Sequence, residues 1–341
     1  YRRRAIKGSK QARDKTQAHD IESRAMHRAF GGDRPAPPAE GYVSISLTAP
    51  EASQRLLREC ATSRMVHVTR LLAIEGIDVN VKDARGRPAL VVAATHGVDA
   101  VVTALIEAGA EIDATAPDGT SAAFAASSFG HADALKALVS AACDVDKARN
   151  DGQTPAYAAA GAGHGEALDL LLEAGCDIDR ALPGKAATPL LAAAFNGRAR
   201  VARALLQAGA DPNKCAADGT SALMVASWHG DAAVVRALLD VGADASRVRN
   251  IDGATALYLA AQANHVPVVE LLLERGRADP SAPGGPCRST PLIVAAERGH
   301  VASVRTLLTA GANPNAADAT GWTAGHAACQ GGHVAALNAL L

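Results

Sequence analysis

The chain has 341 residues and a formal net charge of −1, and 48% of its residues are apolar. Alanine alone contributes 79 residues, whereas Phe, Trp and Tyr contribute only 4, 2 and 4. This composition predicts a thin, tightly packed core and argues against the aromatic-walled cavities that hold cofactors and small substrates. A net charge near zero also gives no field that would attract a polyanion.

The 6 cysteines are scattered along the chain and form no Cys-x-x-Cys pair. This usage is typical of reduced thiols inside cells rather than of a disulfide framework. No stretch of the sequence approaches the roughly 18 unbroken apolar residues that a membrane-spanning helix needs. The sequence therefore predicts an intracellular protein, cytoplasmic or nuclear, without a membrane span.

Residues 1–47 differ in composition from the rest of the chain. They carry 10 Lys/Arg and 5 Asp/Glu. The rest of the chain therefore carries 24 Lys/Arg and 30 Asp/Glu, a formal net charge of −6. The segment mixes the run Arg2-Arg3-Arg4 with Gly31-Gly32 and a proline-rich stretch at 35–38, a composition that disfavours a packed core. We expect a basic, disordered arm. A nucleic-acid contact of this arm is a weaker interpretation than a solvated tail.

From residue 82 onward, three markers repeat with one period. A leucine of a Leu-Leu-like pair recurs every 33 to 35 residues, at Leu105, Leu138, Leu171, Leu205, Leu238, Leu272, Leu307 and Leu340. The residue that opens a Thr-Pro-Leu-like segment keeps the same intervals, at Pro88, Ser121, Thr154, Thr188, Ser221, Thr255, Thr290 and Thr323. A glycine follows most of the leucine pairs. This periodicity indicates a solenoid of stacked units.

Each unit is composed of a hairpin turn followed by two short helices. In the third unit, Asp151-Gly152 supplies a turn with positive φ, and Thr154 can accept from the first free amides of a helix. We expect helices over 156–162 and through 168–172, with Gly175 left-handed after the second. Helices this short are marginal alone, so each unit depends on its neighbours.

This pattern of Asp-Gly-x-Thr-Pro-Leu-x-x-Ala-Ala-x-x-Gly-His, followed by Leu-Leu-x-x-Gly-Ala-Asp, is similar to the ankyrin repeat. The seventh unit carries Thr290-Pro291-Leu292, Gly299-His300 and Leu307-Leu308. The resemblance covers 82–341 in eight units, the last one truncated, and residues 48–81 fit a degenerate N-capping unit. It implies an all-α solenoid of helix-turn-helix units with projecting hairpins, which binds another protein through its concave groove and hairpin tips.

Several positions depart from the family pattern. The His after Thr-Pro-Leu is kept only as His326, and elsewhere the position is apolar: Val91, Phe124, Tyr157, Leu191, Met224, Tyr258 and Ile293. Ala142 replaces a helix-ending glycine such as Gly276, which predicts strain of about 1 kcal/mol. Extra residues should make three hairpins irregular, at 179–188, 246–255 and 276–290.

Three segments resemble ligand-binding motifs, for phosphate, calcium and zinc, but each lacks a required element. The glycine-rich run 161–165 resembles a phosphate loop, but no strand precedes it. A calcium loop starting at Asp144 lacks the required glycine and glutamate. His326, Cys329 and His333 have spacing that zinc could use, yet the fourth ligand is missing. We expect no catalytic residue, no metal and no cofactor.

The two residues before each Gly-His pair face the groove in this repeat family. Phe129, Phe195 and Trp228 fall in this set, and exposed aromatic side chains in a groove are typical of interaction hot spots. Packing filler at a helix end is the alternative. The candidate partner-binding residues are His96, Phe129, Phe195, Trp228, His229, Glu297 and Arg298, together with Arg85, Arg87, Gln153 and Trp322 at hairpin tips.

Two functions fit these expectations. One is a non-catalytic protein–protein interaction scaffold, and the other is the targeting or regulatory region of a larger enzyme or receptor whose catalytic part lies outside this chain. We expect a monomer, apart from association through an uncapped apolar stripe formed by Val334, Leu337, Leu340 and Leu341. We also expect the natural polypeptide to continue beyond Leu341 with a capping glycine and a further repeat or cap.

Overall fold

The computed structural model describes residues 47–62 and 64–341. The arm expected at 1–47 therefore lies outside the described residues, apart from Leu47. Residues 48–341 form one compact unit. Its regular structure consists of 18 α-helices and one 3₁₀ turn, and the described residues contain only two isolated β-bridges and no strand. The expected all-α solenoid is confirmed.

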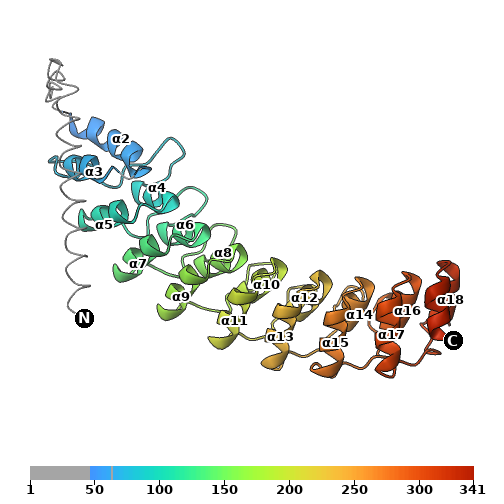
Figure 1. Ribbon diagram of the computed structural model, residues 1–341. Helices are drawn as coiled ribbons and strands as arrows, with labels where there is room; N and C mark the ends of the chain where they lie inside the picture. The colour runs from blue at the N-terminus through green and yellow to red at the C-terminus, as the bar shows by residue number, and fades with distance from the viewer. Residues whose placement is uncertain (1–46, 63) are drawn as a thin grey trace, which may run out of the picture. The chain divides into compact units, whose positions relative to one another are not determined.

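The helices follow one another in pairs along a curved stack (Figure 1). The first helices of the pairs are α2 (Ala49–Cys60), α4 (Ala89–His96), α6 (Ala122–Phe129), α8 (Pro155–Ala162), α10 (Pro189–Phe195), α12 (Ala222–His229), α14 (Ala256–Gln262), α16 (Pro291–Glu297) and α18 (Ala324–Gln330). The second helices are α3 (Met65–Leu72), α5 (Asp99–Glu107), α7 (Ala132–Ser140), α9 (Gly165–Glu173), α11 (Ala199–Gln207), α13 (Ala232–Asp240), α15 (Val266–Glu274), α17 (Val301–Thr309) and α19 (Val334–Leu340). None of these helices is long and apolar enough to cross a membrane.

Each helix packs on the corresponding helix of the next pair, which gives two layers. The first helices form one side of the stack and the second helices the other (Figure 1). Alanines such as Ala93, Ala126 and Ala160 are fully buried in the first layer, so these helices approach closely. The periodic leucines, Leu105 through Leu307, are fully buried between the layers, as the repeat predicts.

The first helices begin where the repeat places a Ser or Thr. The Oγ1 atom of Thr154 accepts a hydrogen bond from the backbone N–H of Tyr157 at 3.1 Å. A cap of this kind contributes about 1 kcal/mol to a helix. The residues that cap in this way are Ser121, Thr154, Thr188, Ser221, Thr255 and Thr290.

Most unit ends agree with the sequence, and one does not. Gly175 is left-handed with φ 80°, and Ala142 adopts φ 61° where other units have glycine. The expectation that Gly276 ends its helix in the left-handed region is wrong, because Arg277 adopts φ 48° instead. The extra residues of this segment move the turn one position along the chain. The same irregular hairpin contains the 3₁₀ turn Pro286–Arg288.

The last unit ends with apolar side chains in contact with solvent. Val334 and Leu341 are exposed, while Leu337 and Leu340 are half-buried. In the preceding unit, the equivalent Leu307 is fully buried, because α19 packs against α17. The apolar stripe expected at this end is therefore partly covered within its own unit.

Candidate functional site

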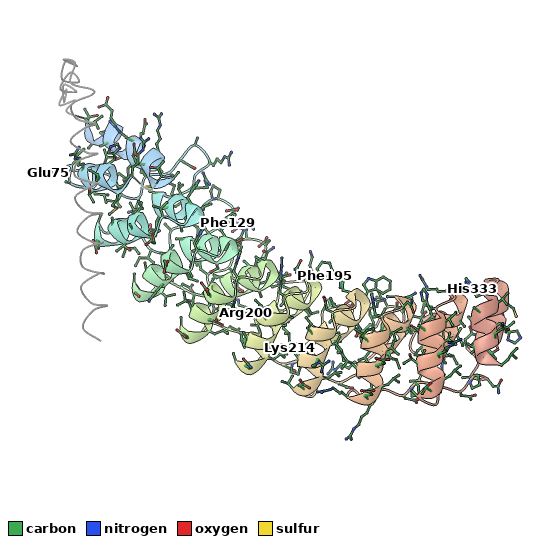
Figure 2. All side chains as sticks on the ribbon, in the orientation of Figure 1. Glu75, Phe129, Phe195, Arg200, Lys214 and His333 are labelled. Carbon is green, nitrogen blue, oxygen red and sulfur yellow. The ribbon has the colours of Figure 1, made fainter. Side chains whose placement is uncertain are left out.

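Three aromatic side chains lie exposed at the ends of first helices. Phe129 ends α6, Phe195 ends α10, and Trp228 is the penultimate residue of α12; their exposed fractions are 57%, 63% and 44%. Figure 2 shows Phe129 and Phe195 on the side of the stack that the first helices form. Large apolar surfaces exposed close together on a folded protein are unusual unless they contact a partner.

A histidine of the neighbouring repeat fixes the end of α12, which carries Trp228. The Nε2 atom of His265 donates to the carbonyl oxygen of Trp228 at 3.0 Å. The same bond joins His131 to the carbonyl of Thr95, at 3.2 Å. Gly230 follows the helix with φ 78°, and a side chain there would collide with the His265 ring. Repeat stacking therefore determines where the end of α12 presents Trp228.

A cavity of about 360 Å³ opens beside two of the exposed aromatics. Its lining comes from α8, α10, α12 and α14 and from the hairpins that precede α10, α12 and α14. Buried Leu191, Met224 and Leu259 form its apolar floor. Phe195 and Trp228 stand at its mouth, together with further lining residues that include Tyr157, Asn196 and His229.

An edge-to-face contact orders the mouth of the cavity. The ring of Phe195 meets the His229 imidazole at a centroid distance of 5.3 Å and an interplanar angle of 81°. The Nδ1 atom of His229 in turn donates to the carbonyl oxygen of Val225, at 3.0 Å. Such contacts favour one orientation of each ring. The exposed ring of Phe195 is therefore oriented by His229 of the next repeat.

The hairpin side of the cavity is charged. The Nε atom of Arg249 donates to Oδ1 of Asp252 at 3.0 Å, and Nη2 donates to Oδ2 at 2.5 Å. These bonds raise the pKa of Arg249 and lower that of Asp252. Burial raises the pKa of Asp218, but hydrogen bonds from Thr220 and the charge of Arg249 outweigh it and leave that pKa below its usual value. All three groups are therefore charged at neutral pH.

The structure brings together three of the candidate residues that the sequence predicts. Phe195, Trp228 and His229 line the same cavity. Phe129 lies two repeats away, where its ring stacks on His131 at 6.2 Å. The remaining helix-end candidates, His96, Glu297 and Arg298, are exposed at the ends of α4 and α16.

The hairpin candidates lie in separate repeats. Arg85 is exposed, whereas Arg87 is half-buried and pairs with Asp83 at 2.8 Å. Gln153 is half-buried, and Trp322 is exposed with its ring 5.9 Å from that of His326. None of these four lines the cavity beside Trp228.

Sequence reasoning missed the floor and the charged side of the cavity. Met224 and Leu191 occupy the position where the family pattern has His. This exchange of a polar for an apolar residue was the sequence signal that could have indicated the apolar floor. Asp218 and Arg249 belong to hairpins, and their repeat positions alone do not set them apart. In the part of the chain that the structure describes, no group of three His, Cys, Asp or Glu side chains is arranged to hold a metal ion.

The comparisons with known proteins agree on the repeat. The model of the family "Ankyrin repeats (3 copies)" matches residues 56–149, 92–181, 123–216, 190–284 and 278–341. The solved ankyrin repeat domain of Bcl-3, described as a unique member of the IkappaB protein family, is similar, with 28% identity and a TM-score of 0.57 over 64% of this chain and 97% of that one. The solved human ASB11 ankyrin repeat domain is also similar, with 27% identity and a TM-score of 0.56 over 64% of this chain and 96% of that one. No curated protein sequence matches the chain.

Proposed function

The chain belongs to the ankyrin-repeat family, and from this premise we propose that it is a non-catalytic scaffold that binds another protein through the groove along its first helices and through its hairpin tips. Ankyrin repeats are protein-interaction modules. The observation that carries the proposal is the cavity whose mouth is formed by the exposed rings of Phe195 and Trp228.

Physical chemistry supports this use of the groove. Aromatic side chains supply large contact areas with few rotatable bonds, and they are enriched among the residues that dominate binding energy. Phe195 and Trp228 stand over an apolar floor, so a partner that covers them removes both the rings and the floor from water. This burial is favourable at about 25 cal/mol per Å² of apolar surface.

We also propose that the protein functions inside the cell. All six cysteines are free in the structure, three of them buried in the stack. Free thiols persist in reducing compartments, whereas proteins of oxidising compartments tend to pair them. The presence of so many unpaired thiols supports an intracellular location.

The test is affinity capture with the full chain as bait, comparing it with the double variant Phe195→Ala/Trp228→Ala. We expect the double variant to retain less than a tenth of the captured partner, because loss of one hot-spot ring typically costs 2 kcal/mol or more. Its melting temperature should stay within a few degrees of the parent, since both rings are exposed. Undiminished capture would contradict the proposal.

A matched control is the double variant Val66→Ala/Val241→Ala, which removes two exposed apolar side chains that do not line the cavity. It should capture the partner like the parent chain. If both double variants lose capture equally, the effect does not belong to the groove. Loss of the fold in Phe195→Ala/Trp228→Ala would show that these rings stabilise the stack instead.

A further inference from the structure

Two hairpin junctions, one hundred residues apart, share the same backbone register. The backbone N–H of Asn150 donates to the carbonyl oxygen of Asp118 at 3.1 Å. In the same way, the N–H of Asn250 donates to the carbonyl oxygen of Asp218 at 2.9 Å. An arginine precedes each asparagine, so the molecule contains two versions of one arrangement.

In the first version, the chain places an arginine in the groove. The Nη2 atom of Arg149 donates to Oδ2 of Asp118 at 3.1 Å, and its Nη1 atom lies 3.7 Å from Oδ2 of Asp151 in its own hairpin. The same guanidinium lies over the ring of Phe124, 5.2 Å from its centroid. It therefore neutralises the hairpin carboxylate and stacks on an aromatic floor at the same time.

In the second version, one extra residue changes the direction of the arginine. Ile251 follows Asn250 and lengthens the hairpin, and its side chain is 70% exposed. Arg249 forms its two hydrogen bonds to Asp252, inside its own hairpin. The ion pairs of the described residues include none between Arg249 and Asp218. The carboxylate that corresponds to Asp118 is left without a direct cationic partner.

The cavity lies at this second junction. Asp218 lines it, and Met224 stands in its floor at the position that Phe124 occupies in the first version. Of the charged hairpin groups, Asp218 and Arg249 line the cavity, and Arg249 is already neutralised by Asp252, which lies outside the lining. Asp218 is therefore the one carboxylate of the lining that has no ion-pair partner among the described residues. The space therefore complements a cation on an apolar stem rather than an anion or a neutral side chain.

We propose that this cavity receives an arginine side chain of the bound partner, which pairs with Asp218 and packs against Met224 beneath the rings of Trp228 and Phe195. The inference rests on the proposed function, because it assumes that the groove binds a protein. An arginine fits better than a lysine, since its planar guanidinium binds a carboxylate through two hydrogen bonds and stacks on aromatic faces. Its methylene stem suits the apolar floor.

An uncharged anchor is the weaker occupant. It would cover the cavity and leave the Asp218 carboxylate out of water without a direct cationic partner, which is strongly unfavourable. The intramolecular pair of Arg149 with Asp118 shows that the local geometry accommodates a guanidinium at a junction of this kind. The cavity therefore favours partners that present an arginine side chain at this point over partners that do not.

The experiment uses the full chain and N-acetylarginine methylamide as the probe, with the neutral citrulline derivative for comparison. The chain has two tryptophans, so the two indole N–H signals in a nitrogen-15 spectrum report the cavity (Trp228) and a distant repeat (Trp322). We expect saturable shifts of the Trp228 signal with the arginine derivative, binding of the citrulline derivative at least about tenfold weaker, and an unmoved Trp322 signal.

Two variants assign the effect to the carboxylate. Asp218→Asn keeps the acceptor for the Thr220 amide but loses the charge, and we expect it to abolish the preference for arginine. The matched variant Asp118→Asn, at the junction where the chain supplies its own arginine, should bind the probe like the parent. Circular dichroism verifies that both variants keep the fold.

A third variant tests the role of the insertion. Deletion of Ile251 should return Arg249 to Asp218 and abolish probe binding without removing a residue that lines the cavity. The proposal is overturned if the arginine derivative causes no shift, if citrulline binds equally, if Asp118→Asn loses binding as Asp218→Asn does, or if the deletion variant binds like the parent. Each of these results would overturn the arginine site alone. The scaffold function is tested separately, by partner capture and its dependence on Phe195 and Trp228.

Discussion

The imidazole of His265 joins two neighbouring repeats, because its Nε2 atom lies 3.0 Å from the carbonyl oxygen of Trp228. The ring also fills the space over Gly230, where any side chain would collide with it. The end of α12, which presents Trp228 to the groove, is thus held by a residue of the following repeat. Stability of the stack and geometry of the groove are coupled at this bond.

The variant His265→Ala should therefore lower both stability and binding. We expect the free energy of unfolding to fall by about 1 kcal/mol, because the carbonyl of Trp228 loses its partner. Partner capture should weaken as the end of α12 loosens. Urea denaturation followed by circular dichroism measures the first effect. The control is His96→Ala, whose exposed imidazole bonds within its own helix, to the carbonyl oxygen of Val92; equal destabilisation by both variants would contradict this account.

Ala142 offers a gain in stability. It adopts φ 61°, a region in which an L-residue is strained by roughly 1 kcal/mol and glycine is not. Ala142→Gly should therefore raise the free energy of unfolding, by up to about 1 kcal/mol less the larger chain entropy of glycine when unfolded. Ala141→Gly is the matched control, because Ala141 has φ −88° and should lose stability. A stabilised Ala141→Gly variant would exclude strain relief as the cause.

Much of the fold could be predicted because each repeated residue has a local task. The buried leucines such as Leu171 follow from the helical period, and caps such as Thr154 follow from the place of the hydroxyl before a helix. These residues act within their own unit or on its immediate neighbour. Periodicity alone therefore places them.

The cavity could not be predicted in the same way, since it depends on where one side chain turns. Arg149 and Arg249 occupy equivalent positions. Arg149 pairs with Asp118 of the preceding hairpin as well as with Asp151 of its own, whereas Arg249 pairs with Asp252 of its own hairpin. The sequence shows that an extra residue lengthens the hairpin, but not which carboxylate the arginine then selects. Gly276 is a similar case, because the inserted residues shifted the left-handed position to Arg277.

Acid should weaken the contact between the sixth and seventh repeats. Burial lowers the pKa of His300 from its ordinary value of 6.5, and the charges of Arg298 and His333 act in the same direction, against a hydrogen bond to the Gln262 carbonyl. Because the folded state takes up this proton less readily than the unfolded chain, stability is full above about pH 6.5 and declines as the pH falls through the folded pKa.

The variant His300→Gln should accordingly flatten part of the decrease in melting temperature between pH 7 and pH 5. His96→Gln serves as a control, because His96 is exposed at the end of α4. Scanning calorimetry at several pH values gives the comparison. Parallel pH profiles for His300→Gln and the parent chain would rule out His300 as a source of the acid sensitivity.

The six thiols should differ widely in reactivity, because the thiolate is the reactive form. Burial raises the pKa of Cys60 to about 12, with a further contribution from Glu59. Burial and nearby aspartates raise the pKa of Cys143 and Cys176 to about 11. At pH 8, a thiol with such a pKa is ionised in about one molecule in a thousand.

Iodoacetamide at pH 8 should therefore label Cys287 and Cys329, which are exposed, well before the half-buried Cys215, and the buried three only after the stack opens. Mass spectrometry of peptides from a time course gives the order. Addition of urea should make all six react within the same period, which shows that folding rather than local sequence protects them. Early labelling of Cys143 or Cys176 in the folded chain would mean that the ends of α7 and α9 open to solvent, contrary to the packing that buries them between neighbouring repeats.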